Sequence, residues 1–199
     1  MKRTGIVLAG GRSSRFGSNK AIYDFQGKTM LKHSVDLLRP FCEHILISGD
    51  KEEYYRYDYP CIPDKYGEIG PLGGIASCLD ESDSEENIIV TCDMPLITSD
   101  LVAKLLVYHQ PGKVTAFIDS HGRIYPFPLI IQKSHTSSLR RQIDERKYQI
   151  QELMDEVGFT PVLLKEEELL CLANVNSKDD LQKIEHGYSY KIKNECIKK

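Results

Sequence analysis

Short apolar, strand-like runs alternate with stretches of helical spacing over residues 1–110. Runs rich in apolar and β-branched residues predict strands at 6–8, 44–48, 61–64 and 87–92. Apolar residues on one face, together with capping residues, predict helices over 29–38, 52–57, 72–79 and 98–109. This alternation is typical of an α/β fold with a mostly parallel sheet, covered by helices on both faces through right-handed crossovers.

The rest of the chain has a less regular pattern. Strands are expected at 114–118 and 124–131, and the turn residues between them favour a hairpin. Helices are expected over 136–146, over 149–157 and from 178 onward, with strands at 161–164 and 169–173. No linker is long enough to separate two independent domains, so a single domain is expected.

Composition excludes several functional classes. The 199 residues include 26 Lys plus Arg and 29 Asp plus Glu, a formal charge of -3 that gives too weak a field to hold nucleic acid. No apolar run approaches the roughly 20 residues that cross a bilayer, so no membrane contact is expected. The amino terminus has neither the length nor the cleavage site of a signal peptide, which predicts a cytoplasmic protein. The six scattered cysteines are expected to be buried or idle thiols.

The loop after the first strand has the residues of a phosphate-binding site. Gly10 and Gly11 let backbone amides approach a ligand closely, and Arg12, Arg15 and Lys20 add three nearby cations. A Walker A loop does not fit, because Lys20 is not followed by Ser or Thr, and the glycine spacing of a dinucleotide-binding fingerprint is missing. The alternative interpretation is a tight turn whose cations are only solvated.

Two carboxylates follow other predicted strands. Asp93 comes directly after the apolar strand 87–92, where a charge needs a partner, and a Mg2+ ion bound to phosphates would be a suitable one. The alternatives are a capping or turn residue for Asp93 and an ordinary loop acid for Asp64. Ligands of such sheets bind outside the carboxyl ends of the strands, so the loop after Leu8, Asp64 and Asp93 are expected to converge on one crevice.

Three motifs in the chain resemble those of the molybdenum cofactor guanylyltransferase family. They are Leu8-Ala9-Gly10-Gly11-x-Ser13-x-Arg15-Phe16-Gly17-x-x-Lys20, Gly70-Pro71-Leu72-x-Gly74-Ile75 and Cys92-Asp93-Met94-Pro95. Many nucleotidyltransferases that act on sugar and alditol phosphates share variants of the first motif, but its double glycine followed by Ser13 favours this family. The stretch Asn174-x-Asn176-x-x-Asp179-Asp180-Leu181 resembles the family's closing motif. The domain is therefore expected to span 1–185, with 186–199 as a carboxyl-terminal extension.

The resemblance implies a Rossmann-like, three-layer nucleotidyltransferase fold. It also implies an enzyme that transfers GMP from GTP to molybdenum-molybdopterin, forming molybdopterin guanine dinucleotide and pyrophosphate. By this resemblance, Lys20 contacts the phosphates, Asp93 contacts both Mg2+ and GTP, and the remaining nucleotide contacts are Leu8, Ala9, Gly10, Gly11 and Asp64. The chain departs from the family after the second strand, where Ser48-Gly49-Asp50 stands in place of an expected asparagine.

Such a reaction needs no acid-base pair, because a terminal phosphate nucleophile is already ionised near neutral pH. The enzyme then works by positioning its substrates and offsetting charge. Lys20 and Arg15 are expected to stabilise the charge that develops on pyrophosphate, and Asp93 to fix the cation. Candidate pterin contacts are 125–128, Arg140, Arg141 and 174–176, although the two arginines also fit a solvated helix face.

Two alternative functions stay open. A related nucleotidyltransferase would use CTP or UTP on a cofactor or on a sugar or alditol phosphate, with the same phosphate loop and metal-binding acid. The other alternative is a nucleotide-binding regulator without turnover. The presence of the metal-holding Asp93 argues against it, because binding alone does not require this residue. The expected partners are GTP and molybdenum-molybdopterin, with transient contacts to proteins that deliver molybdopterin or mature molybdoenzymes.

Overall fold

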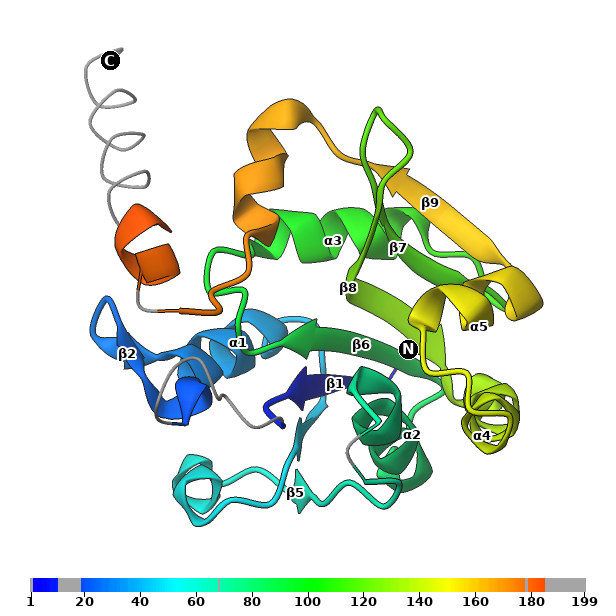
Figure 1. The fold of residues 1–199 in the computed structure, drawn as a ribbon, viewed down its shortest axis with the longest axis horizontal. Helices are drawn as coiled ribbons and strands as arrows, with labels where there is room; N and C mark the ends of the chain where they lie inside the picture. The colour runs from blue at the N-terminus through cyan, green and yellow to red at the C-terminus, as the bar shows by residue number, and fades with distance from the viewer. Residues whose placement is uncertain (1, 11–18, 68, 178, 185–199) are drawn as a thin grey trace.

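A computed structural model describes residues 2–10, 19–67, 69–177 and 179–184 of the chain (Figure 1). Its main sheet has seven strands in the order β5-β4-β1-β6-β8-β7-β9. The strands are β1 (Arg3–Leu8), β4 (His44–Ser48), β5 (Cys61–Ile62), β6 (Glu86–Thr91), β7 (Val114–Ile118), β8 (Ile124–Gln132) and β9 (Phe159–Leu163). Neighbours pair in parallel except where β8 meets β6 and β7, so the predicted mostly parallel sheet is confirmed.

Helices cover both faces of this sheet, which confirms the predicted three-layer α/β fold (Figure 1). On one face lie α1 (Met30–Leu38) and α3 (Ser99–Tyr108). On the other lie α2 (Pro71–Glu81) and α4 (Thr136–Asp144), with α5 (Ile150–Val157) packed beside α4. Thr29 and Thr98 cap α1 and α3, because each side-chain oxygen accepts a hydrogen bond from a backbone N–H of the first turn.

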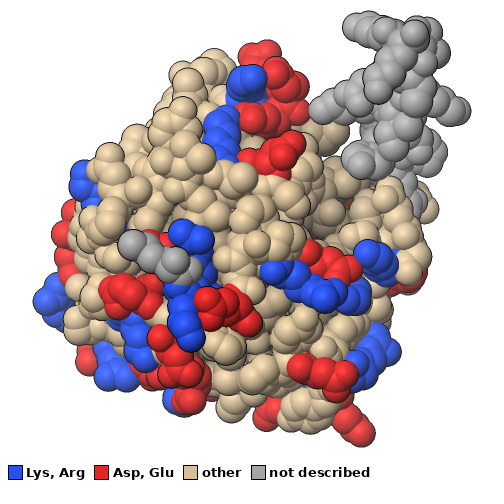
Figure 2. All heavy atoms as spheres, turned by 180° about the vertical axis from the view of Figure 1, so that it is seen from behind, with Lys and Arg blue, Asp and Glu red and all other residues tan. Residues whose placement is uncertain are grey.

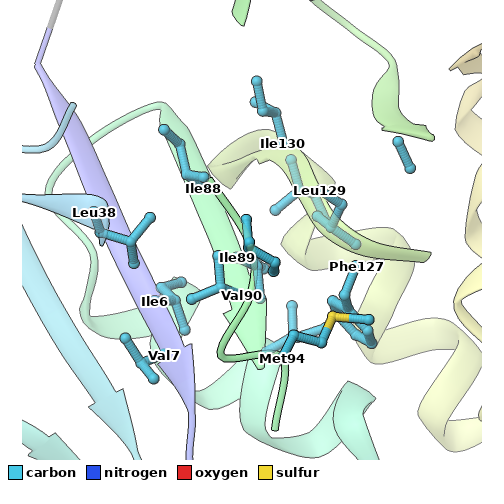
Figure 3. Packing of buried hydrophobic residues seen from close by; sticks show 14 of the residues in the cluster. Ile6, Val7, Leu38, Ile88, Ile89, Val90, Met94, Phe127, Leu129 and Ile130 are labelled. Carbon is cyan, nitrogen blue, oxygen red and sulfur yellow. The ribbon is translucent and has the colours of Figure 1, made fainter. Parts of the chain in front are cut away.

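The main core lies between the sheet and its helices (Figure 3). The central strands are apolar on both faces, as buried parallel strands require, and Ile6, Val7 and 88–90 are fully buried. Met94, from the loop after β6, points toward Phe127 of β8 in Figure 3, and both are nearly buried. The core therefore extends to the ends of the strands and supports the loops that follow them.

A second, smaller core lies beside the loop that connects β6 to α3. It contains Phe25, Met30, Leu96, Val175, Leu181 and Ile184. Phe25 belongs to a two-stranded ribbon of β2 (Asp24–Phe25) and β3 (Lys28–Thr29), joined by Gln26 and Gly27 with φ values of 55° and 82°. This core brings the segment around Val175 to the same side of the molecule as the end of β6.

The structure differs from the sequence-based prediction at one expected strand and contains one ribbon that was not expected. The strand predicted at 169–173 is wrong: this stretch belongs to η4, a 3-10 helix over Glu166–Leu172. Its apolar residues do not alternate regularly, and the Glu168 carboxylate accepts a hydrogen bond from the Lys165 backbone N–H, which favours a helical first turn. The β2–β3 ribbon was not predicted, because strands of two residues carry no measurable period. The expected helix after 178 is present over 179–184.

The molecular surface carries charges of both signs. Figure 2 shows basic side chains interspersed with acidic ones over the visible face. Several of them form ion pairs, among them Lys65 with Glu81 and Lys28 with Asp36. Within the described residues, no helix combines the length and apolar character needed to cross a membrane.

Candidate active site

Three central strands end at the same level and bring their loops together. Leu8 of β1 is in register with Ser48 of β4 on one side and Thr91 of β6 on the other. Beyond the strands, the Ala9 N–H donates to the Ser48 carbonyl at 3.0 Å and the Cys92 N–H donates to the Leu8 carbonyl at 3.1 Å. The start of the predicted phosphate loop and the loop carrying Asp93 therefore share one edge of the sheet.

Lys20 and Asp93 form an ion pair at this edge. Lys20 Nζ lies 2.9 Å from Asp93 Oδ2, although 73 residues separate them along the chain. Their side chains are 15% and 20% exposed, so the pair is shielded but still reaches solvent. Lys20 begins η1, a 3-10 helix over Lys20–Ile22, and Asn19 Oδ1 caps that helix by accepting from the Ala21 N–H at 3.3 Å. A short capped turn thus fixes where the lysine side chain starts.

The other carboxylate oxygen of Asp93 is available to a further positive group. Asp93 Oδ1 is buried and has no hydrogen-bond partner in the part of the chain that the structure describes. A buried anionic oxygen without a partner is costly, and such positions commonly hold a ligand or ion. Asp93 therefore has one carboxylate oxygen paired with Lys20 and a second oxygen that remains available to a ligand or an ion.

The segment 174–176, which resembles the family's closing motif, lies against the same loop. The Val175 N–H donates to the Asp93 carbonyl at 2.7 Å, and Asn176 Oδ1 accepts from Lys20 Nζ at 3.5 Å. Lys20 and Asn176 are 156 residues apart in the sequence. The small core around Val175 supplies the packing that holds this distant segment in place.

Asp64 lies beside the first turn of α2 rather than in the Lys20–Asp93 pair. Asp64 Oδ1 accepts from the Tyr66 N–H at 2.8 Å. A Cβ at Gly73 would lie 2.7 Å from both Asp64 carboxylate oxygens, and one at Gly74 would collide with the Ser48 hydroxyl. The two glycines therefore let Asp64 and Ser48 approach the positive end of α2.

Tyr54 is a residue of this region that the sequence reading missed. It lies in η2, a 3-10 helix over Glu52–Tyr57, and is fully buried. Its hydroxyl donates to the Ala9 carbonyl at 2.7 Å and lies 3.1 Å from Asn19 Oδ1. Burial raises the pKa of this hydroxyl well above its usual range, so it remains a hydrogen-bond donor at neutral pH.

Gly49 explains why the asparagine expected after the second strand is absent. Its φ is 136°, a conformation that side chains rarely adopt, and a Cβ there would lie 3.0 Å from Cε2 of Tyr54. Asparagine at this position would strain the backbone and press on the Tyr54 ring.

Three of the expected site residues, Gly11, Arg12 and Arg15, lie outside the described residues. Leu8, Ala9 and Gly10 lie where the sequence placed them, at the end of β1. The roles expected for all these residues stay predictions.

The candidate pterin contacts lie in separate places. Arg140 pairs with Asp80 of α2 at 2.6 Å and Arg141 pairs with Glu156 of α5, so both charges are matched by the helices beside α4. In the β7–β8 hairpin, the Tyr125 hydroxyl donates to Asp119 Oδ2 at 3.2 Å. Of these candidates, 174–176 is the group that contacts the Lys20–Asp93 pair in the described part of the chain.

The cysteine next to Asp93 is a neutral thiol. Burial raises the pKa of Cys92 to about 12, and the Asp93 carboxylate adds to this effect. Burial also raises the pKa of Cys78, on α2, to about 12. Because the thiolate is the reactive form, neither residue is a nucleophile near neutral pH, in agreement with the expected idle thiols.

Comparisons with known proteins show what the chain as a whole is similar to. Residues 5–158 match the family model described as the MobA-like NTP transferase domain. A probable molybdenum cofactor guanylyltransferase of Flavobacterium johnsoniae is 32% identical over 179 residues, which cover 89% of this chain and 94% of the relative. A molybdenum cofactor guanylyltransferase of Xanthomonas euvesicatoria pv. vesicatoria is 40% identical over 118 residues, 58% of this chain and 59% of the relative.

The fold also matches solved structures. Molybdopterin-guanine dinucleotide biosynthesis protein A from Archaeoglobus fulgidus superposes with a TM-score of 0.77 at 22% identity, covering 94% of this chain and 99% of that one. At this level of identity the likeness bears on the fold alone.

Proposed function

Because the chain belongs to the MobA-like NTP transferase domain family, we propose that it is a molybdenum cofactor guanylyltransferase. The reaction transfers GMP from GTP to molybdenum-molybdopterin and releases pyrophosphate. The observation that carries the proposal is the pairing of Lys20 with Asp93 at 2.9 Å, at the strand ends where α/β sheets bind ligands. Lys20 ends one of the motifs that resemble the guanylyltransferase family, Asp93 belongs to another, and Asn176 belongs to the stretch that resembles the closing motif.

In the proposed reaction a terminal phosphate oxygen of molybdopterin attacks the α-phosphorus of GTP. The bond from the α-phosphorus to the bridging oxygen breaks, and pyrophosphate leaves with the electron pair of that bond. Lys20 contacts the triphosphate and offsets the charge that develops on the leaving pyrophosphate. Its contacts with Asp93 and Asn176 orient the ammonium group before the substrate binds, so little reorganisation is needed during the reaction.

The other proposed contacts surround this lysine. Arg15 adds a second cation at the pyrophosphate. Leu8, Ala9, Gly10 and Gly11 hold the nucleotide, chiefly through backbone groups, since Ala9 and Gly10 directly follow a strand end. Asp64 contacts the nucleotide from the start of α2.

Nucleotidyltransferases of this family generally use a divalent metal ion. Asp93 fits such an ion, because Oδ1 is buried without a partner among the described residues and carboxylate oxygen is the preferred protein ligand of hard cations. Mg2+ commonly takes only one or two protein carboxylates and completes its shell with phosphate oxygens and water. We therefore propose Mg2+ at Asp93, where it would neutralise phosphate charge when bound.

The second substrate and the partner proteins belong to the same proposal. The segment 174–176 is the best placed of the candidate pterin contacts, because it is anchored to the Asp93 loop and reaches Lys20. Proteins that deliver molybdopterin, or that insert the product into molybdoenzymes, would make transient contacts near this edge.

A nucleotide panel tests the proposal. The purified protein is incubated with molybdenum-molybdopterin, Mg2+ and one of GTP, CTP, UTP or ATP, and both pyrophosphate and the dinucleotide product are measured. We expect equal amounts of both products with GTP and little of either with the other three. Turnover with CTP or UTP instead would identify a related transferase. Nucleotide binding without pyrophosphate release in all four reactions would indicate a regulator.

A further inference from the structure

We propose that Tyr54 is a positioning residue for Lys20, because it binds the residues at both ends of the glycine-rich stretch, Ala9 before it and Asn19 after it. Its hydroxyl donates to the carbonyl of Ala9, the first residue after β1, at 2.7 Å. The same hydroxyl also donates to Oδ1 of Asn19, the residue directly before Lys20, at 3.1 Å, so its one proton is shared by two acceptors. One side chain from η2 therefore contacts the residues at both ends of this stretch. The inference rests on the proposed function, because it gives Tyr54 a part in the same reaction.

The ring of Tyr54 is held firmly enough to act in this way. It is 0% exposed and is among the largest fully buried side chains of the molecule. Lys51 Nζ lies 5.9 Å from the ring centroid, and Gly49 leaves room on the other edge, since even a Cβ there would come within 3.0 Å of the ring. A ring packed on all sides has one position, so the hydroxyl has one position as well.

Asn19 transmits the constraint to Lys20. Asn19 Oδ1 accepts from the Ala21 N–H at 3.3 Å, and the Asn19 carbonyl accepts from the Ile22 N–H at 3.2 Å. These two bonds define the first turn of η1, the 3-10 helix that Lys20 begins. A 3-10 helix of three residues has little stability of its own, so its orientation depends on such outside contacts. The Asn19 side chain thus sets the direction from which Lys20 reaches Asp93.

Packing alone does not account for the hydroxyl. Phenylalanine would fill the same buried space, and a buried hydroxyl lowers stability unless it is hydrogen-bonded. The same 3-10 helix offers a comparison in Tyr57, whose hydroxyl lies 2.6 Å from Thr29 Oγ1 at the start of α1. Both hydroxyls make tertiary hydrogen bonds, but Tyr54 alone of these two binds the residues that flank the glycine-rich stretch.

Tyr54→Phe, with Tyr57→Phe as the matched control, tests the proposal. Each substitution removes one hydroxyl from η2 and keeps the ring. With GTP as substrate we expect Tyr54→Phe to lower kcat about tenfold and to change KM less than about twofold, because Lys20 is misplaced mainly for the chemical step. Tyr57→Phe should keep both constants. Normal kcat in Tyr54→Phe, or an equal loss in both variants, overturns the proposal.

Hydrogen exchange gives a readout that does not depend on the reaction. The amides of Ala21 and Ile22 report on the turn that Asn19 caps. We expect them to exchange faster in Tyr54→Phe than in the unmodified protein or in Tyr57→Phe. If the unmodified protein transfers no nucleotide, the proposed function fails while exchange still decides whether Tyr54 holds this turn. Unchanged exchange in Tyr54→Phe overturns the proposal.

A second variant tests the contact between Tyr54 and Asn19 by changing Asn19. Asn19→Ala removes the side chain that joins Tyr54 to η1. If the two residues act through one link, the double variant Tyr54→Phe/Asn19→Ala should lose no more kcat than the more impaired single variant. Losses that multiply would show independent effects and overturn the proposal. Should Tyr54→Phe fail to fold, Gly49→Ala replaces it, because the new Cβ would lie 3.0 Å from the Tyr54 ring, and Gly27→Ala, also at a positive φ, is its control. Equal kcat and equal exchange at Ala21 in these two variants would overturn the proposal.

Discussion

Asp93 has one carboxylate oxygen paired with a cation and one without a partner among the described residues. Oδ2 is 2.9 Å from Lys20 Nζ, and Oδ1 is buried with no partner within the described part of the chain. Burial strengthens the attraction for cations, because solvent screens the charge less than at an open surface. Lys20 in turn contacts Asn176, so three distant parts of the chain meet at a single ammonium group. The proposed chemistry at this edge therefore depends on very few side chains.

Lys20→Ala is expected to reduce the chemical step more than substrate binding. Losing a preorganised positive group at the leaving pyrophosphate should lower kcat about a hundredfold, by analogy with other charge-stabilising contacts. Steady-state kinetics with GTP measures this effect. Lys104→Ala is the control, because Lys104 forms a comparable pair with Glu168 at 2.7 Å and both of those side chains are 24% exposed. An unchanged kcat with an altered KM alone would contradict the assigned role.

Asp93→Ala should abolish turnover while the protein stays folded. The Lys20–Asp93 pair still reaches water, so its loss should change the free energy of unfolding by only about 1 kcal/mol. Pyrophosphate release and urea unfolding would be measured on the same preparation. Asp36→Ala provides a control, since Asp36 is a partly buried carboxylate that pairs with Lys28 and Lys32 and has no part in the proposed reaction. Near-normal guanylyl transfer by Asp93→Ala would refute the metal assignment.

Elements with a strong local pattern could be predicted from the sequence, and elements that depend on distant contacts could not. β4 and β7 have the predicted bounds, because both are apolar, β-branched runs between clear breaks. β5 ends at Ile62 instead of Asp64, since Pro63 has no N–H for the ladder. The predicted strand at 169–173 failed because it has no neighbouring strand in the sheet order, and Leu169 and Leu172 pack against the core from a 3-10 helix instead.

The same distinction applies to the candidate site. Lys20 and Asp93 are charged residues within recognisable motifs, so both could be predicted from the sequence. Tyr54 and Asn19 have ordinary residue types, and their importance comes from the chain path that brings them within 3.1 Å of each other. Membership of the family is confirmed by the match over residues 5–158, whereas the individual residue roles stay predictions.

Gly49→Ala should disturb the turn after β4 and, through it, the position of Tyr54. The φ of 136° alone should lower the free energy of unfolding by about 1–3 kcal/mol. In addition, the new Cβ would lie 3.0 Å from the Tyr54 ring, which has no free space to retreat into. We therefore expect a lower kcat together with faster amide exchange at Ala21.

Gly27→Ala is the control that separates backbone strain from the contact with the Tyr54 ring. Gly27 also has a positive φ, 82°, but nothing lies within 4 Å of a Cβ built there. The Gly27→Ala variant should lose stability through backbone strain and keep the kcat of the unmodified protein. If Gly49→Ala behaves like Gly27→Ala in kinetics and exchange, the contact with Tyr54 has no functional consequence.

At the scale of the whole molecule, the charge distribution favours local recognition over long-range attraction. The formal charge is -3, and on the face in Figure 2 the basic and acidic side chains alternate. Such a surface does not concentrate polyanions around the protein. A triphosphate would therefore have to be recognised by the few cations at the strand ends, which agrees with a small-molecule substrate.

The stability of the molecule should fall when the pH drops from 7.5 to 5.5, because two histidines are held in their neutral form. His109, at the end of α3, has its Nδ1 2.8 Å from Thr115 Oγ1, and burial lowers its pKa, although the nearby Glu86 opposes this effect. His135 is 7% exposed, its Nε2 lies 3.2 Å from the Gly112 carbonyl, and burial lowers its pKa as well. Below about pH 6.5 the unfolded chain binds protons that the folded protein does not, so the free energy of unfolding decreases as the pH falls.

Urea unfolding of the unmodified protein and of His109→Gln/His135→Gln at several pH values tests this expectation. Carboxylates whose pKa values are lowered, such as that of Glu168, titrate well below this window and do not contribute to the slope. The double variant should therefore be less stable at pH 7.5 but nearly independent of pH down to 5.5. His44→Gln, at an exposed position, should keep the pH dependence of the unmodified protein. Equal slopes in the unmodified protein and the double variant would assign the acid sensitivity to other groups.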